Sequence, residues 1–364
     1  MNILHIAHIG NGLAYGTNVV VPKHVREQSA YADVGLLNIS DEQVKNEFML
    51  TYPGIDKFPD DLPKPFDRPD IVVFHEVNYI EYIKMYKKLV ARNIPYIIVP
   101  HGENTKTALR RKFWKKKIAY ILLFNRFIRK SLGLQCLSKG EYDQTETSDR
   151  KFIVPNGMDL HEKLSAHSER KGMRLLYIGR LDWEQKGLDI LIEAVGTFEN
   201  PELRLDIFGP DIVGRRAVVQ GLIDKFGAAD RIAVHDPIYG KEKERLYSEC
   251  DVFIQTSRFE GLPLGVLEAM SYGKPVLVTK GTNLAEEVDL YDAGFTAGND
   301  VAGVKTALER AFNAKKSLGY KGDNAHRLVS EEFAWDKIAK KAVETYGRLL
   351  DDGTQGAALG RKRA

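Results

Sequence analysis

The chain has 364 residues, of which 43% are hydrophobic and 28% charged, and its formal net charge is +3. This length predicts two domains, and the composition excludes a disordered or fibrous protein. The two cysteines, Cys136 and Cys250, lie in apolar stretches, so we expect reduced, buried thiols rather than a disulfide framework. The sequence shows neither a secretory signal pattern nor an apolar run of about 18 residues, which predicts a cytoplasmic protein.

The first half of the chain alternates short apolar runs with amphipathic stretches. The apolar runs predict strands over residues 1–9, 71–75, 96–100, 134–137 and 151–154. Helical periodicity predicts helices over residues 79–91 and 108–130. Strands that alternate with helices are typical of a parallel sheet that is covered on both faces.

The second half repeats this plan more regularly. Predicted strands cover residues 174–178, 203–208, 232–235, 252–255 and 275–279. Predicted helices cover residues 188–194, 215–226, 241–250 and 264–272. Two such sets in one chain predict an α/β protein with two doubly wound, Rossmann-like domains.

The turn-forming stretch Val154-Pro155-Asn156-Gly157 follows a predicted strand and is the expected domain boundary. We predict a first domain over residues 1–158, a second over 159–332, a C-terminal helix over 333–350 that returns to the first domain, and a disordered tail over 351–364. Ligands of doubly wound sheets bind beyond the carboxyl ends of the strands, so we expect the domains to face each other across a cleft.

The segment from Phe259 to Met270 follows a predicted strand and opens a helix. It holds two carboxylates, Glu260 and Glu268, separated by a loop rich in glycine and proline. A carboxylate can accept hydrogen bonds from paired sugar hydroxyls, and amides at a helix N-terminus suit a phosphate or sugar oxygen. An ordinary helix with an acidic first turn would explain Glu260 alone, but not the loop beside it.

A second polar segment, from Tyr177 to Gly187, also follows a predicted strand and precedes a helix. Arg180 and Lys186 bracket its turn, and two cations at the carboxyl end of a strand are well placed to bind a diphosphate. Ordinary surface charge on a solvated loop is the alternative interpretation, and this segment alone does not decide between them.

Taken together, these motifs resemble family 4 glycosyltransferases with the GT-B fold. The resemblance is strongest from Phe152 to Glu287 and says little about which sugar moves. It is carried by Gly179-Arg180-Leu181, Lys186-Gly187, Glu260-Gly261-Leu262-Pro263, Glu268-Ala269-Met270, Gly273-Lys274-Pro275-Val276 and the junction Val154-Pro155-Asn156-Gly157-Met158-Asp159.

The resemblance implies that the second domain binds a nucleotide-sugar, most often with a uridine base. Arg180 and Lys186 would hold and stabilise the departing diphosphate, and Glu268 would bind the ribose hydroxyls. Glu260 would contact the donor sugar. The remaining donor contacts would come from the loop after it and from a stretch beside the base, namely Gly261, Leu262, Pro263, Leu264, Pro237 and Ile238.

In the first domain, which the resemblance makes the acceptor domain, His101 ends a predicted strand. It corresponds to the family's active-site histidine, near the transferred sugar. The alternative is a histidine whose ring is satisfied by a backbone carbonyl. The glycines after the first strand depart from the usual family loop, so acceptor or phosphate contacts at Gly12, Gly16 and Thr17 stay an open expectation. The segment 280–283 also follows a strand and is expected near the cleft.

The expected reaction is the transfer of a hexose-type sugar with retention of anomeric configuration. Fixed cations would stabilise the leaving diphosphate, so no metal and no other cofactor is expected. The sequence contains no Asp-x-Asp motif and no His/Cys metal cluster. The departing phosphate oxygen would accept the proton of the acceptor, and a nucleophilic role of Glu260 is the alternative.

No acidic residue lies between Glu103 and Glu141, where eleven lysines and arginines gather around aromatic residues. A basic amphipathic helix over 109–130 predicts contact with an anionic membrane surface, hence a lipid-linked or glycan acceptor in cell-surface polysaccharide assembly. An ordinary domain helix with one buried face is the alternative.

A nucleic-acid partner is not expected. A nucleotide-sugar epimerase and a non-catalytic homologue that only binds partners are the rival functions.

Overall fold

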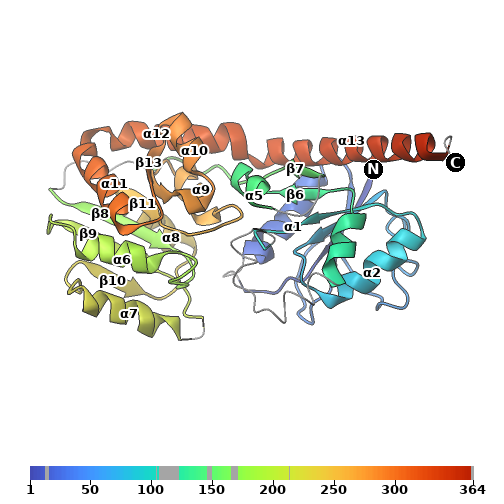
Figure 1. The fold of residues 1–364 in the computed structure, drawn as a ribbon, viewed down its shortest axis with the longest axis horizontal. Helices are drawn as coiled ribbons and strands as arrows, with labels where there is room; N and C mark the ends of the chain where they lie inside the picture. The colour runs from blue at the N-terminus through green and yellow to red at the C-terminus, as the bar shows by residue number, and fades with distance from the viewer. Residues whose placement is uncertain are drawn as a thin grey trace. The chain divides into compact units, whose positions relative to one another are not determined.

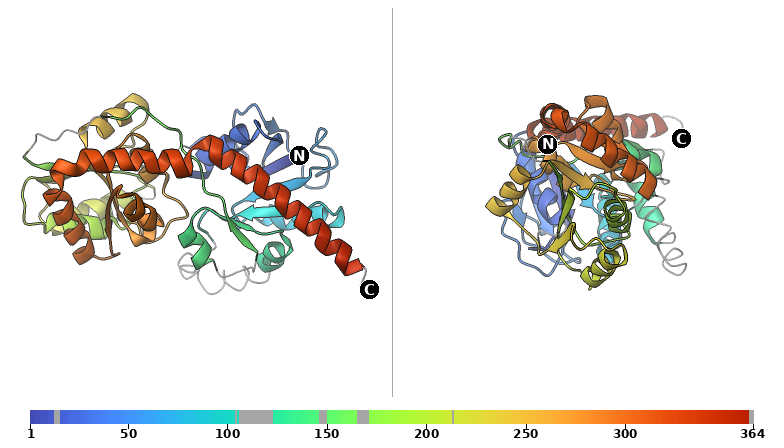
Figure 2. Two further views of the ribbon diagram at one scale, coloured as in Figure 1. Left: turned by 90° about the horizontal axis from the view of Figure 1, so that it is seen from above. Right: turned by 90° about the vertical axis from the view of Figure 1, so that its left-hand side faces the viewer.

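The computed structural model describes residues 1–12, 16–103, 105, 123–145, 150–164, 171–212 and 214–361, with side chains up to residue 352. The chain forms two compact units. The first comprises Met1–Gly157 together with Trp335–Ala364, and the second comprises Met158–Ala334. Each unit is a parallel sheet with helices packed against it (Figure 1, Figure 2).

The first unit has a seven-stranded sheet in the order β3-β2-β1-β4-β5-β6-β7. Its strands are β1 Asn2–Ala7, β2 Asp33–Asn38, β3 Met49–Leu50, β4 Ile71–His75, β5 Tyr96–Val99, β6 Leu134–Cys136 and β7 Lys151–Ile153. Its helices include α1 Gly16–Gln28, α2 Ile80–Ala91, α5 Lys139–Gln144 and α13 Trp335–Arg361. All strand pairs are parallel, and α13 packs against α1.

The second unit has a six-stranded parallel sheet in the order β10-β9-β8-β11-β12-β13. Its strands are β8 Met173–Ile178, β9 Leu203–Phe208, β10 Ile232–His235, β11 Val252–Gln255, β12 Val276–Thr279 and β13 Gly294–Ala297. Its α-helices are α6 Leu188–Gly196, α7 Arg215–Lys225, α8 Gly240–Glu249, α9 Leu264–Ser271, α10 Ala285–Tyr291, α11 Val301–Asn313 and α12 Leu318–Leu328. This is the predicted α/β architecture.

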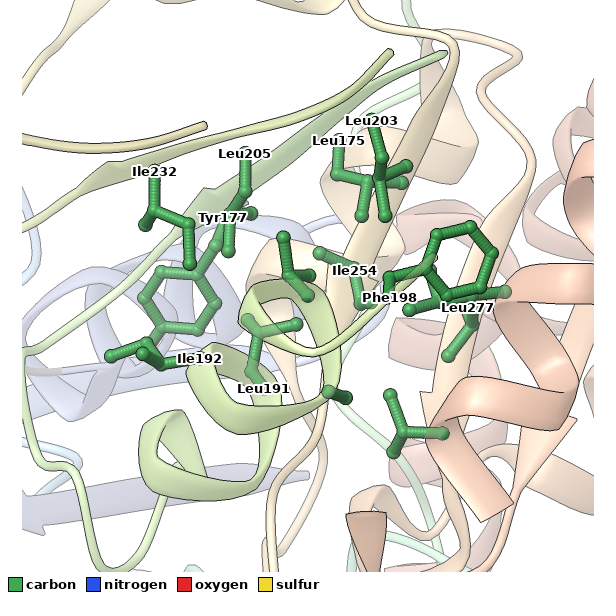
Figure 3. Packing of buried hydrophobic residues seen from close by; sticks show 14 of the residues in the cluster. Leu175, Tyr177, Leu191, Ile192, Phe198, Leu203, Leu205, Ile232, Ile254 and Leu277 are labelled. Carbon is green, nitrogen blue, oxygen red and sulfur yellow. The ribbon is translucent and has the colours of Figure 1, made fainter. Parts of the chain in front are cut away.

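Each unit has its own hydrophobic core. In the second, side chains of β8 and β9 such as Tyr177 and Leu205 pack toward Leu191 and Ile192 of α6 (Figure 3). In the first, Phe74 and Tyr96 of neighbouring strands pack with Phe127. Residues of the central strands β1, β4, β5, β11 and β12 are almost all buried, which agrees with their apolar runs in the sequence, whereas β3, β7 and β10 are mostly half-buried or exposed. The two cysteines are free and buried, as predicted.

Several elements lie where the sequence analysis expected none. Helix α1 contains Pro22, which disfavours a helix interior, yet Val20, Val21 and Val25 on this helix are buried. This burial, with α1 packed against β2 and α13, outweighs the local propensity. At the other end of the chain, α13 continues to Arg361, into the stretch for which we expected a disordered tail. Residues 351–361 hold two alanines and one leucine, which favour a helix, but also three glycines, which disfavour it, so they extend the helix that precedes them rather than forming one by their own propensity.

The basic segment is only partly within the described residues. Residues 109–122, which carry most of its lysines and arginines, lie outside them. Residues 123–130 are helical, and Phe124, Phe127 and Ile128 of this stretch are buried in the core of the first unit. In this part of the segment, therefore, the apolar face covers the protein's own core rather than a membrane.

Candidate functional site: two loops at the carboxyl edge of each sheet

The strand order of the second unit reverses between β8 and β11, which are neighbours in the sheet. The loops that follow them carry Arg180, Lys186 and Glu260. These loops touch at Gly187, whose φ is +65° and where a Cβ would lie 2.1 Å from the Thr256 carbonyl oxygen. The Thr256 hydroxyl donates to the Gly187 carbonyl at 2.9 Å. Only glycine allows this approach, so the turn fixes one loop against the other.

The two loops are joined by a buried ion pair. Lys186 Nζ lies 2.6 Å from Glu260 Oε1, and the side chains are 14% and 9% exposed. Ser257 Oγ donates to the same carboxylate oxygen at 2.7 Å, and Gln255 Nε2 donates to it at 3.0 Å. A buried carboxylate with one cation and two neutral donors is held in a single orientation.

A second ion pair braces the same loops. The Arg258 guanidinium donates to both oxygens of Asp189, at 2.8 and 2.7 Å, and this hydrogen bonding raises the pKa of Arg258. The Arg258 amide donates to the Gln185 carbonyl at 2.9 Å. These contacts fix the backbone beside Lys186 and Glu260 and do not involve the side chains of Lys186 or Glu260.

Arg180 has a fixed backbone and a loosely held side chain. The Tyr177 hydroxyl donates to the Arg180 carbonyl at 2.9 Å. Its half-buried guanidinium makes one long hydrogen bond, 3.4 Å to Gln185 Oε1, among the described residues. A guanidinium has five donors, so Arg180 retains most of its capacity to bind an anion.

Helix α9 begins directly after the Glu260 loop. Its N-cap residue, Pro263, has extended backbone and supplies no side-chain cap. The amides of the first turn of a helix have no partner within the helix, so those near Leu264 are suited to an external acceptor. Gly261, Leu262 and Pro263 are buried and Leu264 is half-buried, which fixes the path of this backbone.

Glu268 lies one turn further along α9 and is paired with a residue that the sequence analysis did not single out. Lys243 Nζ of α8 lies 2.5 Å from Glu268 Oε2, with both side chains about one-fifth exposed (20% and 24%). The carboxylate is therefore ordered and still accessible. Nothing in the charged sequence of α8 distinguishes Lys243 from its neighbours, so only the packing of α8 against this edge reveals the pair.

The segment 280–283 follows β12 and packs onto the Glu260 loop, within the same unit. The Asn283 side-chain amide donates to the Glu260 carbonyl. A Cβ on Gly281 would lie 2.3 Å from the Ser257 carbonyl oxygen. By contrast, Pro237 and Ile238 follow β10, two strands away from β8, where Pro237 is exposed and Ile238 half-buried.

In the first unit, His101 follows β5 in a left-handed backbone conformation, with φ of +49°. Glu141 of α5 accepts from the next amide, Gly102 N, and from Leu137 N, both at 2.6 Å. Burial raises the pKa of Glu141 to about 7, against these two hydrogen bonds, which lower it. His101 Nε2 lies 3.0 Å from His75 Nδ1, so its partner is a side chain rather than the backbone carbonyl of the alternative interpretation.

The glycine-rich loop lies only partly within the described residues, because 13–15 fall outside them. Gly12 and Gly16 flank this gap, and Gly16 begins α1. Asn18 Nδ2 donates to the Gly12 carbonyl at 2.7 Å. Thr17 hydrogen-bonds with Glu76, whose pKa burial raises to about 7. Thr17 is therefore directed at the carboxyl end of β4, whereas Asn11 donates to Glu42, which follows β2.

The described residues provide neither an evident metal site nor a membrane-spanning helix. No cluster of three or more His, Cys, Asp or Glu side chains that could hold a metal ion occurs among them. Within the same described part of the chain, none of the helices combines the length and apolarity that crossing a membrane requires.

Comparison with known proteins gives the family context. Residues 162–327, which include Arg180, Lys186, Glu260 and Glu268, match the family model of glycosyl transferases group 1. An MMP alpha-(1->4)-mannosyltransferase from Mycolicibacterium hassiacum is 25% identical over 217 residues, which are 57% of this chain and 51% of the relative. The chain spans about half the length of the curated relatives it matches.

Solved structures resemble nearly the whole chain. Sucrose-phosphate synthase from Thermosynechococcus elongatus superposes with a TM-score of 0.76 and 17% identity, over 97% of this chain and all of that one. HepE from Anabaena, in complex with UDP-glucose, superposes with a TM-score of 0.73 and 16% identity, over 96% of this chain and all of that one. The fold is therefore GT-B, and the match to residues 162–327 supports a glycosyltransferase.

Proposed function

We propose that this protein is a retaining, family 4 glycosyltransferase that moves a hexose-type sugar from a UDP-sugar to an acceptor. The observation that carries the proposal is the pairing of cations and carboxylates on the loops after β8 and β11, where Lys186 and Glu260 are 2.6 Å apart. These residues lie inside the segment that matches glycosyl transferases group 1. Hydroxyl-rich, anionic donors need both kinds of group.

Cleavage of the anomeric bond leaves negative charge on the diphosphate. Arg180, with its lightly used guanidinium, and Lys186 would bind these oxygens and stabilise the charge as it develops. Because Lys186 is already fixed by Glu260, its ammonium group would need little reorganisation when the donor binds. We propose that Arg180 and Lys186 would stabilise the charge of the departing diphosphate and that a metal ion is not required.

The carboxylates would recognise hydroxyls. Glu268, ordered by Lys243 and partly accessible, would accept from the ribose hydroxyls. Glu260 and the backbone from Gly261 to Leu264 would contact the donor sugar, and Pro237 and Ile238 would lie beside the base. His101 would contact the transferred sugar, with acceptor or phosphate contacts from Gly12, Gly16 and Thr17. These roles rest on the resemblance and on the fixed positions of the loops.

For the acceptor we propose a glycan or a lipid-linked saccharide, as in cell-surface polysaccharide assembly on the cytoplasmic face of a membrane. The support is the sequence of the basic segment over 109–130, and within it the lysines and arginines of 109–122, because the apolar face of residues 123–130 packs into the core. Flotation with liposomes that contain an anionic lipid would test this part, and no binding at low salt would contradict it.

The main experiment measures donor binding and hydrolysis over UDP-, GDP-, ADP- and dTDP-sugars. We expect one preferred donor, a roughly tenfold weaker donor affinity in Glu268→Ala and a kcat lower by about 10²–10³ in Lys186→Ala. Glu309→Ala and Lys316→Ala, at exposed positions in and after α11, are matched controls that should behave as wild type. Epimerisation of the donor without an acceptor would contradict the proposal, as would donor binding without turnover when acceptors are supplied.

A further inference from the structure

Behind His101, a series of buried polar side chains crosses the first unit. His101 Nε2 lies 3.0 Å from His75 Nδ1, and His75 Nε2 lies 2.9 Å from His5 Nδ1. His5 Nε2 lies 3.1 Å from Gln28 Oε1. His5, His75 and Gln28 are each at most 2% exposed. His5 lies in β1, His75 ends β4 and His101 follows β5, and these three strands are consecutive in the sheet.

The direction of hydrogen bonding in this series is set at its far end by the backbone. Gln135 Nε2 donates to the Val154 carbonyl at 3.1 Å, so Gln135 Oε1 is free to accept the Tyr346 hydroxyl at 2.7 Å. Because the Tyr346 proton is used in this way, the Tyr346 oxygen can only accept from the next residue, Gln28.

Gln28 is the link between this network and the histidines. Burial raises the pKa of Tyr346, and hydrogen bonding by Gln28 and Gln135 offsets part of the rise. The Gln28 Nε2 atom forms no hydrogen bond of standard geometry among the described residues, and its interaction is with the Tyr346 hydroxyl. With Nε2 toward a hydroxyl that can only accept, Gln28 presents Oε1 to His5. The opposite orientation would place two acceptor oxygens against each other.

The amide oxygen of Gln28 determines the tautomer of each histidine. It accepts only, so His5 carries its proton on Nε2 and its Nδ1 is an acceptor. His75 must then donate from Nε2, and by the same argument His101 also donates from Nε2. Burial lowers the pKa of His5 to about 3 and lowers that of His75 well below its usual value, so these rings are neutral at pH 7. The same cause lowers the pKa of His101, although part of that side chain stays accessible.

We infer that Gln28, through His5 and His75, is a positioning residue that fixes His101 in the Nε2–H tautomer and thereby makes its Nδ1 a hydrogen-bond acceptor for a substrate hydroxyl. The consequence for catalysis rests on the proposed function, but the tautomer does not. Gln28 ends α1 and Tyr346 lies on α13, so the packing of these two helices orients a side chain at the carboxyl end of β5.

The test is long-range proton–nitrogen NMR of the full chain labelled with ¹⁵N-histidine, which reports the protonated nitrogen of each ring. We expect His5, His75 and His101 to carry the proton on Nε2 at pH 7. Gln28→Met keeps the length of the side chain but removes the acceptor, and should shift the ratio of the two tautomers by about tenfold or more toward Nδ1–H at all three histidines. Gln28→Glu retains an acceptor oxygen toward His5 and, as a buried protonated carboxyl, a donor toward Tyr346, so it should keep the wild-type tautomers.

His24 is the internal control, because its Nε2 lies 3.0 Å from Asn156 Oδ1 and it is not part of the series. Its tautomer should be the same in both variants. Tyr346→Phe is a second variant that keeps the fold's apolar contacts and should shift the tautomers in the direction of Gln28→Met, by a smaller amount. A proton on His101 Nδ1 in the wild type, or unchanged tautomers in Gln28→Met, would overturn the inference.

Kinetics separate this inference from the proposed function. If both hold, Gln28→Met should lower kcat by about tenfold with little change in the KM for the donor, because the donor loops lie in the other unit. Gln28→Glu should restore kcat. A chain that shows the expected tautomers but transfers no sugar would contradict the proposed function alone. A kcat unchanged in Gln28→Met, with the tautomers reversed, would overturn the positioning role.

Discussion

The two units hold their polar side chains by different means. In the second, Lys186 and Glu260 form a buried ion pair, and Lys243 and Glu268 form a partly exposed one. In the first, His101 ends a series of neutral, buried groups. Charges oppose burial unless they are paired, whereas neutral imidazoles need only one donor and one acceptor each. A site built from charges should therefore lose stability when one partner of an ion pair is removed. A site built from neutral groups should instead be sensitive to changes that reverse the donor–acceptor order of its hydrogen bonds.

The largest effect should come from breaking the buried pair. Lys186→Met leaves the Glu260 carboxylate buried without its cation, and should lower the free energy of unfolding by about 3–5 kcal/mol. The double variant Lys186→Met/Glu260→Gln should recover more than half of this loss, because no charge is left unpaired. Denaturant unfolding of the full chain measures both. A double variant as unstable as the single one would show that the pair is not the origin of the effect.

The contact between the two donor loops gives a second test. Gly187 and Gly214 are both left-handed N-cap residues, with φ of +65° and +73°, but only Gly187 has a neighbour where a Cβ would lie. Gly214→Ala should cost about 1 kcal/mol of unfolding free energy, for the backbone conformation alone. Gly187→Ala should cost at least about 3 kcal/mol, because the Thr256 carbonyl must also move. Equal costs would indicate that the loops are not held in contact.

The first unit should respond to pH through Glu76. Burial raises the pKa of its carboxyl to about 7, above the usual value of 4.5, so the folded state binds this proton more tightly than the unfolded state. Its contribution to stability is complete below pH 4.5 and is lost as the pH rises through about 7, by roughly 3 kcal/mol. Glu76→Gln should reduce the slope of this part of the stability profile without abolishing it, because the pKa of Glu141 is also raised to about 7 by burial, whereas Glu309→Gln, at an exposed position of α11, should leave the slope unchanged.

The smallest effect should come from the partly exposed pair. Lys243→Ala should lower the free energy of unfolding by no more than about 1 kcal/mol, because solvent screens both charges. It should also weaken donor binding less than Glu268→Ala does, since the carboxylate itself remains. Titration of the preferred donor by calorimetry compares the two variants, and equal losses would assign ribose recognition to the lysine as well.

How far the sequence could be interpreted differs between the two units. In the second, strands such as Leu203–Phe208 and Val252–Gln255 were predicted with the bounds that the structure has. Their continuous apolar runs leave little choice, because a strand buried on both faces needs apolar residues throughout. In the first unit, α1 and β2 escaped prediction, since Pro22 and a polar turn mask the periodicity of α1 and Gly35 interrupts β2. In the second unit, β13 and the helices α10, α11 and α12 escaped prediction as well.

By itself, the sequence determined the α/β class, the strands that end at the site, and the loops with Arg180, Lys186, Glu260 and Glu268, because these depend on local pattern and spacing. Only the tertiary structure decided which groups those side chains meet. Lys243 reaches Glu268 from another helix, and Gln28 reaches His101 through two strands. Such contacts join residues far apart in the chain, and the local sequence around a charged or polar residue does not indicate which residue it will contact. The packing of the helices and strands determines which side chains meet.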